Sequence, residues 1–137
     1  MSNQRSELSP KNKYWIPKYR YLELKNFCLQ YPAWKKELNE ISYLKTKSEI
    51  SPPGNFSNPT ELLAIKRLQL EQNINLIDSV AEQADPCLAK WIIRGITENY
   101  TYEYLKYQLD LPAGRDMYYD RYRRFFWILD MKRDGQY

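Results

Sequence analysis

Two runs of helix-spaced apolar residues, separated by a break, occupy residues 101–133. Before the break, Tyr104, Leu105 and Leu109 recur at helical spacing. After it, the same spacing relates a mainly aromatic series, which comprises Tyr118, Tyr122, Phe125, Phe126 and Leu129. The break includes residues 111–114 (LPAG), whose Pro and Gly end helices. Two helices across a short turn, the second one basic, are typical of a helix-turn-helix DNA-binding unit.

The ends of this helix pair fit the same unit, with two departures in the connection. Thr101 is expected to cap the first helix, because its hydroxyl can accept a hydrogen bond from a free backbone amide. The connection LPAGRD is longer than the turn of about 3–4 residues that usually joins such helices. Asp110 stands where Gly is usual, but Asp tolerates the left-handed backbone conformation better than most residues. These two departures weaken the match to a helix-turn-helix without cancelling it.

The second helix has an apolar side and a polar side. A step of about 100° per residue gathers the aromatic series on the side that must be buried. The opposite side is expected to carry Asp116, Tyr119, Asp120, Arg123 and Trp127, with Arg124 beside them. The residues expected to contact DNA are Arg115, Tyr119, Arg121, Arg123, Arg124 and Lys132. Trp127 on the outward side indicates either a partner or packing against the N-terminal segment.

Most of these side chains have a defined role in the DNA-binding hypothesis. Arg115 or Arg123 could donate two hydrogen bonds to guanine O6 and N7, and Tyr119 could contact a phosphate or stack. Arg121 and Lys132 suit backbone phosphates, and the free amides at the start of the helix could hold another. The alternative is that the arginines form an ordinary solvated face, paired with acidic neighbours.

Composition changes along the rest of the chain predict its organisation. Residues 1–13 are polar and without periodicity, which predicts a flexible N-terminal segment. Residues 14–47 are dense in aromatics and lysines and predict a helical hairpin, whereas residues 48–59 are rich in Pro, Ser and Asn and predict a linker. Residues 60–137 predict a helical domain with the helix-turn-helix at 101–133. The expected fold class is therefore all-α, a small helical bundle with a C-terminal helix-turn-helix.

Proline positions and apolar spacing predict the helix starts and inward faces. Pro17, Asn58-Pro59 and Asp85-Pro86 each suit the start of a helix. The inward residues of the first two helices are expected to be Tyr21, Leu24, Cys28, Leu29, Trp34, Leu38 and Ile41. Those of the long third helix are Leu62, Ile65, Leu68, Leu70, Ile74, Ile77, Val80 and Ala81. Those of the fourth are Leu88, Trp91, Ile92 and Ile96.

The net charge of +4 is unevenly distributed. Residues 1–47 carry ten Lys and Arg against four Asp and Glu, whereas residues 48–98 carry four against seven. Residues 115–137 are again basic, with six against four. Basic ends around an acidic middle favour an anionic partner, although a solvated surface is the alternative.

Several classes of function are excluded by what the sequence lacks. The chain has no His and no Gly-rich phosphate loop, and its carboxylates are scattered singly, so we expect no enzyme, metal or cofactor. Cys28 and Cys87 have apolar neighbours and are expected to be buried free thiols in a reducing cytoplasm. No apolar run approaches about 18 residues, so no membrane partner is expected.

Three stretches resemble small proteins encoded in phages and prophages of Gram-positive bacteria. They are YRYLELKNFCLQYPAW, DPCLAKWIIRGIT and ITENYTYEYLKYQLDLPAGRDMYYDRYRRFFWILDMKR. The resemblance is to the RinA/ArpU group of phage transcriptional regulators, whose C-terminal part is similar to the promoter-reading region 4 of sigma factors. It implies an all-helical protein that controls phage genes, with residues 115–124 on promoter DNA.

The hypothesis that follows is a sequence-specific DNA-binding transcription regulator of phage or prophage genes. Its expected partners are double-stranded DNA and, as a further candidate, RNA polymerase, with a homodimer as the form that would match two half-sites. The alternative is a phage-encoded helical adaptor that binds protein through exposed aromatics of residues 14–34 and Trp127. Salt separates the two, because binding through phosphates weakens steeply as salt rises.

Overall fold

The computed structural model describes residues 12–47 and 58–134, and these ranges contain six α-helices and no strand. The helices are α1 (Lys18–Leu29), α2 (Tyr31–Lys47), α3 (Asn58–Ala84), α4 (Ala89–Thr97), α5 (Tyr102–Gln108) and α6 (Arg115–Asp134). The expected all-α bundle is confirmed. The predicted flexible N-terminal segment (residues 1–13) and the predicted linker (residues 48–59) lie outside the described residues, except for residues 12–13 and 58–59. No helix in the described ranges is long and apolar enough to cross a membrane.

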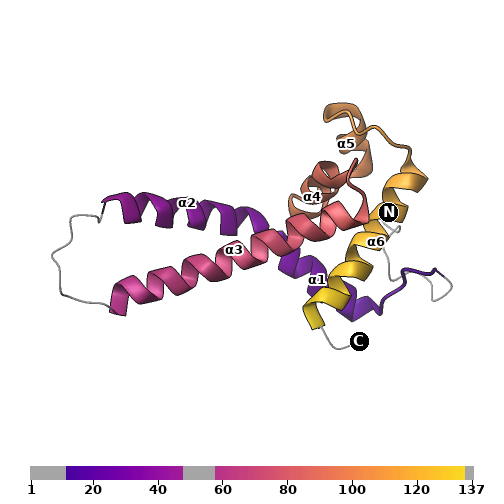
Figure 1. Cartoon of the computed structure of the whole chain (residues 1–137). Coiled ribbons are helices and arrows are strands. Elements are labelled where there is room, and N and C mark those ends of the chain that lie inside the picture. Colours follow the sequence, from indigo (N-terminus) through magenta and orange to yellow (C-terminus); the bar gives the residue numbers. More distant parts are fainter. Residues whose placement is uncertain (1–11, 48–57, 135–137) are drawn as a thin grey trace.

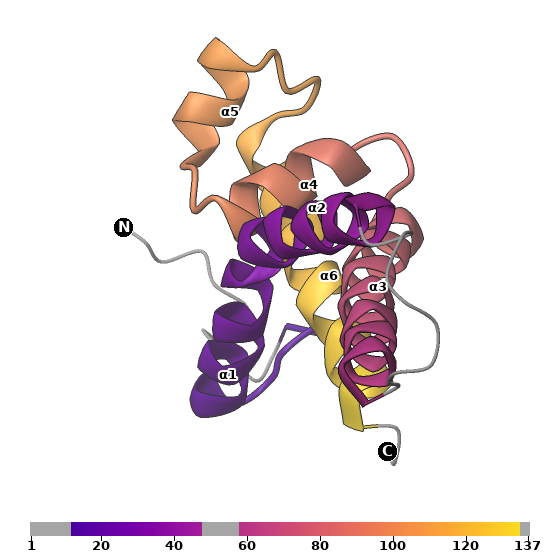
Figure 2. The same cartoon turned by 90° about the vertical axis from the view of Figure 1, so that its left-hand side faces the viewer.

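The central helix of the bundle is α6. It packs against α1, α3 and α4, and Figure 2 shows it between α1 and α3. The aromatic series predicted to be inward is buried throughout, and Phe125, Phe126 and Leu129 are inaccessible to solvent. Burying such rings removes a large apolar area from water, so α6 organises the core.

The first two helices do not fold back on each other as the predicted hairpin of residues 14–47 would. They follow one another across Gln30, and α2 runs along α3 instead (Figure 1). Trp34 and Ile41 are both 8% exposed and lie on one face of α2, at a spacing of seven residues, which is two helical turns. We call residues 35–47 and 58–69, which project from the bundle as this helix pair, the arm.

The prediction for α3 is right for its second half and wrong for its first. Leu70, Ile74, Ile77, Val80 and Ala81 are buried as expected. Leu62, Ile65 and Leu68 are instead 66%, 53% and 54% exposed. At about 100° per residue, Ile65 and Leu68 lie on nearly the opposite side of α3 from the buried line. The helix therefore has two apolar stripes, of which the bundle covers one.

The N-terminal aromatics are mainly core residues rather than an exposed surface. Tyr14, Tyr21, Phe27, Tyr31 and Trp34 are at most 8% exposed, and of the aromatics in residues 14–34 only Trp15 and Tyr19 are exposed. This corrects the surface assumed in the adaptor hypothesis. The Tyr21 and Tyr122 hydroxyls lie 2.7 Å apart inside the core, which links α1 directly to α6.

Three further residues differ in part from the sequence-based expectations. Cys28 is buried as predicted, but Cys87 is exposed in the turn before α4, where it follows Pro86 on the surface. Leu29 is 38% exposed because it ends α1 just outside the packed face. Trp127 packs against Tyr14, with ring centroids 5.5 Å apart. Of the two explanations for Trp127, packing against the N-terminal segment is the one the structure shows.

Candidate nucleic-acid interface

The turn between α3 and α4 is fixed by Asp85. Its Oδ1 accepts hydrogen bonds from the backbone amides of Cys87 at 2.8 Å and Leu88 at 3.2 Å. These amides precede α4 and would otherwise lack partners, so Asp85 acts as a cap for this turn. The sequence prediction that a helix starts near Asp85-Pro86 is confirmed, with α4 proper beginning at Ala89.

Helix α5 begins as predicted at a Thr cap. The side chain of Thr101 accepts a hydrogen bond from the backbone amide of Tyr104 at 3.1 Å. After α5 the chain turns at Asp110, which has a φ of 59°. That value lies in the left-handed region, where Asp is tolerated in place of Gly. The break between α5 and α6 therefore lies where the sequence places it.

Three side chains from α4 and α5 hold the connection between α5 and α6. Trp91 Nε1 donates to the carbonyl of Leu109 at 2.7 Å. Tyr102 Oη donates to the carbonyl of Ala113 at 3.1 Å, and Lys106 Nζ lies 3.4 Å from the carbonyl of Leu111. Because carbonyls that would otherwise be left without partners are satisfied, the connection has a defined path despite its length.

Gly95 lets α4 approach α5 and α6 closely. A Cβ at this position would lie 2.3 Å from Tyr118 Oη and 2.9 Å from Leu105 Cδ1. Leu105 is the buried residue of α5, and Tyr118 is 1% exposed. Burial raises the pKa of Tyr118, so its hydroxyl stays protonated. The contacts among α4, α5 and α6 thus fix the direction in which α6 begins.

Three of the predicted DNA-contacting residues share one side of the first half of α6. Arg115, Tyr119 and Arg123 follow each other at intervals of four residues, so they lie in a line along the helix. Arg115 Nη1 lies 2.7 Å from Glu103 Oε2 of α5, with side chains that are 45% and 58% exposed. The Arg115 guanidinium also lies 5.7 Å from the Tyr119 ring centroid. We call Arg115, Tyr119 and Arg123 the α6 line.

The α6 line is less exposed than the sequence predicts. Tyr119 and Arg123 are half-buried, and Tyr119 packs edge-on against Tyr118 with ring centroids 5.0 Å apart. Arg123 Nε is buried without a hydrogen-bond partner among the described residues. Because α6 contacts α1, α3 and α4, more of its surface is covered than its single apolar side predicts.

Two other predicted residues are bound within the protein. Arg121 Nε donates to Asp85 Oδ2 at 2.9 Å, and Arg121 also pairs with Asp120. The hydrogen bond to Asp85 is the main cause that raises the pKa of Arg121. Arg124 reaches the carbonyl of Gln83 at 3.4 Å and Tyr14 Oη at 3.2 Å. Both arginines therefore tie α6 to the corner between α3 and α4.

Lys132 is exposed but lies far from the other predicted residues. It is 17 positions after Arg115 on the same helix, which is about 25 Å along the axis. Its neighbour Arg133 stacks over the Phe27 ring at 3.8 Å, so this end of α6 lies against α1. The six predicted residues thus fall into three groups rather than one face.

The surface around the α6 line has little net charge. Residues 89–124 carry seven basic residues (Lys90, Arg94, Lys106, Arg115, Arg121, Arg123 and Arg124) and five acidic ones (Glu98, Glu103, Asp110, Asp116 and Asp120), a net charge of +2, and Arg121 is already paired with Asp85 and Asp120. No broad positive field therefore draws phosphates to it. Any nucleic-acid contact here depends on individual side chains such as Arg115.

Sequence reasoning missed three residues that position this region. Asp85 was predicted to start a helix, but its ion pair with Arg121 spans 36 positions, which no spacing rule reveals. Gly95 carried a usable signal, because a Gly inside an apolar helix marks a close approach. Tyr102, which anchors the connection at Ala113, shows no such signal.

No family model matches the chain, and no curated protein and no solved structure is significantly similar to it. The resemblance to the RinA/ArpU regulators therefore stays a prediction.

Proposed function

We propose that the chain is a DNA-binding transcription regulator, which acts as a helix-turn-helix protein with α5 and the first half of α6 as its two motif helices. The observation that carries the proposal is the α6 line, in which Arg115, Tyr119 and Arg123 stand at intervals of four residues. Arg115 and Tyr119 contact Glu103 and Tyr102 of α5. Recognition helices read base edges through side chains spaced in this way near their N-termini.

Arg115 is the main candidate for base contact. Its ion pair with Glu103 is solvent-exposed on both sides, and exposed pairs contribute only about 0–1 kcal/mol. The guanidinium can therefore leave Glu103 for guanine at little cost. Tyr119 would stack or contact a phosphate beside it. RNA polymerase remains a further candidate partner of such a regulator.

Arg121 and Arg124 have a different role in this proposal. Because Asp85, Gln83 and Tyr14 hold them, we assign them to fixing the orientation of α6 rather than to DNA contact. Lys132, about 25 Å away along the axis, is likewise left out of the interface.

A protein-binding adaptor is the second candidate, and a different observation favours it. The arm carries six large apolar side chains that are 37–66% exposed, namely Tyr43, Leu44, Leu62, Leu63, Ile65 and Leu68. Large exposed apolar side chains on one projecting element favour a site of association. The arm is remote from α5 and the start of α6 (Figure 1), so both surfaces could work in one protein.

The test is a selection from random DNA duplexes at two salt concentrations, followed by affinity measurements on variants. Arg115→Ala should weaken specific binding about 5- to 150-fold, as expected for loss of one bidentate base contact. Arg94→Ala is the matched control, because Arg94 is also 45% exposed and ion-paired, but on α4. Failure to enrich any sequence, or equal losses in both variants, would contradict the proposal.

A further inference from the structure

We propose that Glu103 is a specificity-determining residue, which acts together with Arg115 to select a G·C base pair in the DNA site. This inference rests on the proposed function, since it concerns how the same surface distinguishes one base pair from another. Arg115 is the donor of the pair and Glu103 is the acceptor, with Nη1 and Oε2 2.7 Å apart.

The pair lies where α6 begins. Arg115 is the first residue of α6, and Glu103 belongs to α5, which contacts that start. Recognition helices contact base edges through their N-terminal residues, so a base pair that meets Arg115 also lies close to Glu103. The two side chains are 45% and 58% exposed, and both are therefore accessible to a partner.

Two tyrosine rings keep the guanidinium beside Glu103. The Cζ atom of Arg115 lies 5.3 Å from the ring centroid of Tyr102 and 5.7 Å from that of Tyr119. Tyr102 is anchored by its hydrogen bond to the carbonyl of Ala113 at 3.1 Å, and Tyr119 is half-buried. Attraction between a cation and an aromatic face restricts where the cation lies. Because both rings are held, donor and acceptor stay side by side.

The order of donors and acceptors in the pair matches one kind of base pair. In the major groove, a G·C pair presents the N7 and O6 acceptors of guanine and then the N4 amino donor of cytosine. A guanidinium only donates and a carboxylate only accepts, so Arg115 contacts guanine while Glu103 accepts from cytosine. An A·T pair presents an amino donor between two acceptors. It therefore places a donor against Arg115 and an acceptor against Glu103.

Glu103 also acts against other base pairs. Once Arg115 contacts guanine, the carboxylate of Glu103 loses its counter-charge in a groove that is bordered by phosphates. A base edge that presents an acceptor there leaves this carboxylate unpaired, which weakens binding. The amino group of cytosine avoids that loss because it donates to the carboxylate. Specificity therefore comes from an unfavourable contact with the wrong sequence as well as from a favourable contact with the right one.

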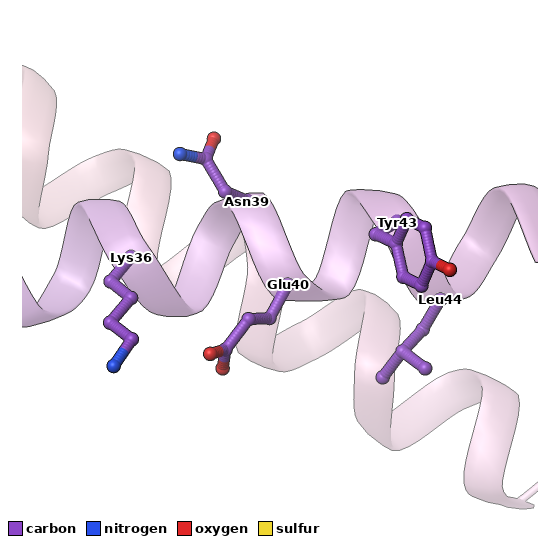
Figure 3. Close-up of a pocket in the computed structure, with 5 residues that line it drawn as sticks. All are labelled: Lys36, Asn39, Glu40, Tyr43 and Leu44. Atoms are coloured by element: carbon purple, nitrogen blue, oxygen red, sulfur yellow. The ribbon is translucent and has the colours of Figure 1, made fainter.

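The open hollow on α2 provides a control for charge. It is lined by Lys36, Asn39, Glu40, Tyr43 and Leu44, and Glu40 points to the same side of the helix as Lys36 (Figure 3). The hollow lies on the arm, remote from α5 and the start of α6 (Figure 1). Replacing the exposed Glu40 therefore changes the net charge of the protein as replacing Glu103 does, but leaves the surface beside Arg115 intact.

Selection from random DNA duplexes with the wild-type chain, Arg115→Ala and Glu103→Gln tests the inference. The wild-type motif should contain one G·C pair at which both variants lose preference, because the two side chains contact the same base pair. Glutamine donates as well as accepts, so Glu103→Gln should lower the preference for cytosine over the other bases about fivefold or more. Glu40→Gln should keep the wild-type motif.

The outcomes separate this inference from the proposal of DNA binding. A wild-type chain that enriches no sequence overturns both. A motif that Glu103→Gln leaves unchanged, or that Arg115→Ala and Glu103→Gln relax at different positions, overturns the role of Glu103 and leaves DNA binding intact. Glu103→Gln should unfold close to the wild-type temperature, because exposed ion pairs contribute little to stability. A lower unfolding temperature with an unchanged motif would make Glu103 a structural residue only.

Discussion

Arg121 and Asp85 form an ion pair of 2.9 Å that joins the middle of α6 to the turn before α4. The Asp85 side chain is only 11% exposed, and its other oxygen holds the amides of Cys87 and Leu88. One carboxylate therefore fixes both a turn and the helix that crosses it.

Loss of Asp85 should cost more stability than loss of Arg121. Asp85→Ala removes the turn hydrogen bonds and one of the two carboxylates that pair with Arg121, so it should destabilise the fold by about 2–4 kcal/mol. Arg121→Ala leaves the turn hydrogen bonds intact and should cost less, about 1–2 kcal/mol. Urea unfolding of both variants measures the order of the two losses. Equal losses would mean that the turn bonds contribute nothing.

Gly95 and Gly114 provide a matched pair of alanine substitutions. Gly95→Ala should destabilise the fold by about 1–3 kcal/mol, because the new methyl group overlaps Tyr118. Gly114→Ala should be close to neutral, since nothing lies within 4 Å of a Cβ there. Adding Tyr118→Phe to Gly95→Ala should recover part of the loss by removing the nearest atom. Thermal unfolding of the three variants tests the prediction, which fails if Gly95→Ala unfolds at the wild-type temperature.

Phe125 should be among the most sensitive positions in the chain. It is fully buried in the central helix, so Phe125→Ala should cost roughly 3–5 kcal/mol. Tyr107, an aromatic residue of α5 that is 74% exposed, is the control, and Tyr107→Ala should change stability little. A small effect at Phe125 would show that α6 is not the organising helix of the core.

Alkaline pH should weaken the fold through its buried tyrosines. Burial raises the pKa of Tyr118 and Tyr122 above the ordinary value of 10.0. The unfolded chain therefore loses these protons at lower pH than the folded chain, and stability falls as pH rises above about 10. Denaturation by urea at about pH 8 and about pH 11 measures the loss. Tyr118→Phe should reduce the difference between the two conditions, and an unchanged difference would exclude Tyr118 as a contributor.

The helix starts and the buried side of α6 could be read from the sequence because each depends on neighbouring residues. Thr101 caps its own helix, and the aromatic series from Tyr118 to Leu129 follows a single helical period. Local chemistry is sufficient for such features.

The surroundings of each helix could not be read in the same way. The sequence pattern assigned the apolar residues of α3 to a single inward face, and it could not show that Ile74 faces the bundle while Ile65 faces outward. On α6 it separated the aromatic series from Arg121 and Arg124, yet the partners of those arginines are about 36–110 positions away. Arg121 and Arg124 therefore leave the set of predicted DNA-contacting residues. Tertiary contacts, and not local spacing, decide which outward residues are available to a partner.

The hydroxyl contact between Tyr21 and Tyr122 spans 101 positions of the chain. At a synthesis rate of ~5–20 residues per second, α1 would leave the ribosome some ~5–20 s before its partner in α6 exists. During that interval α1 can contact α2 and α4, but the α6 side of its aromatic face stays uncovered. Newly made chains should therefore depend on α1 being kept from aggregation until translation is complete.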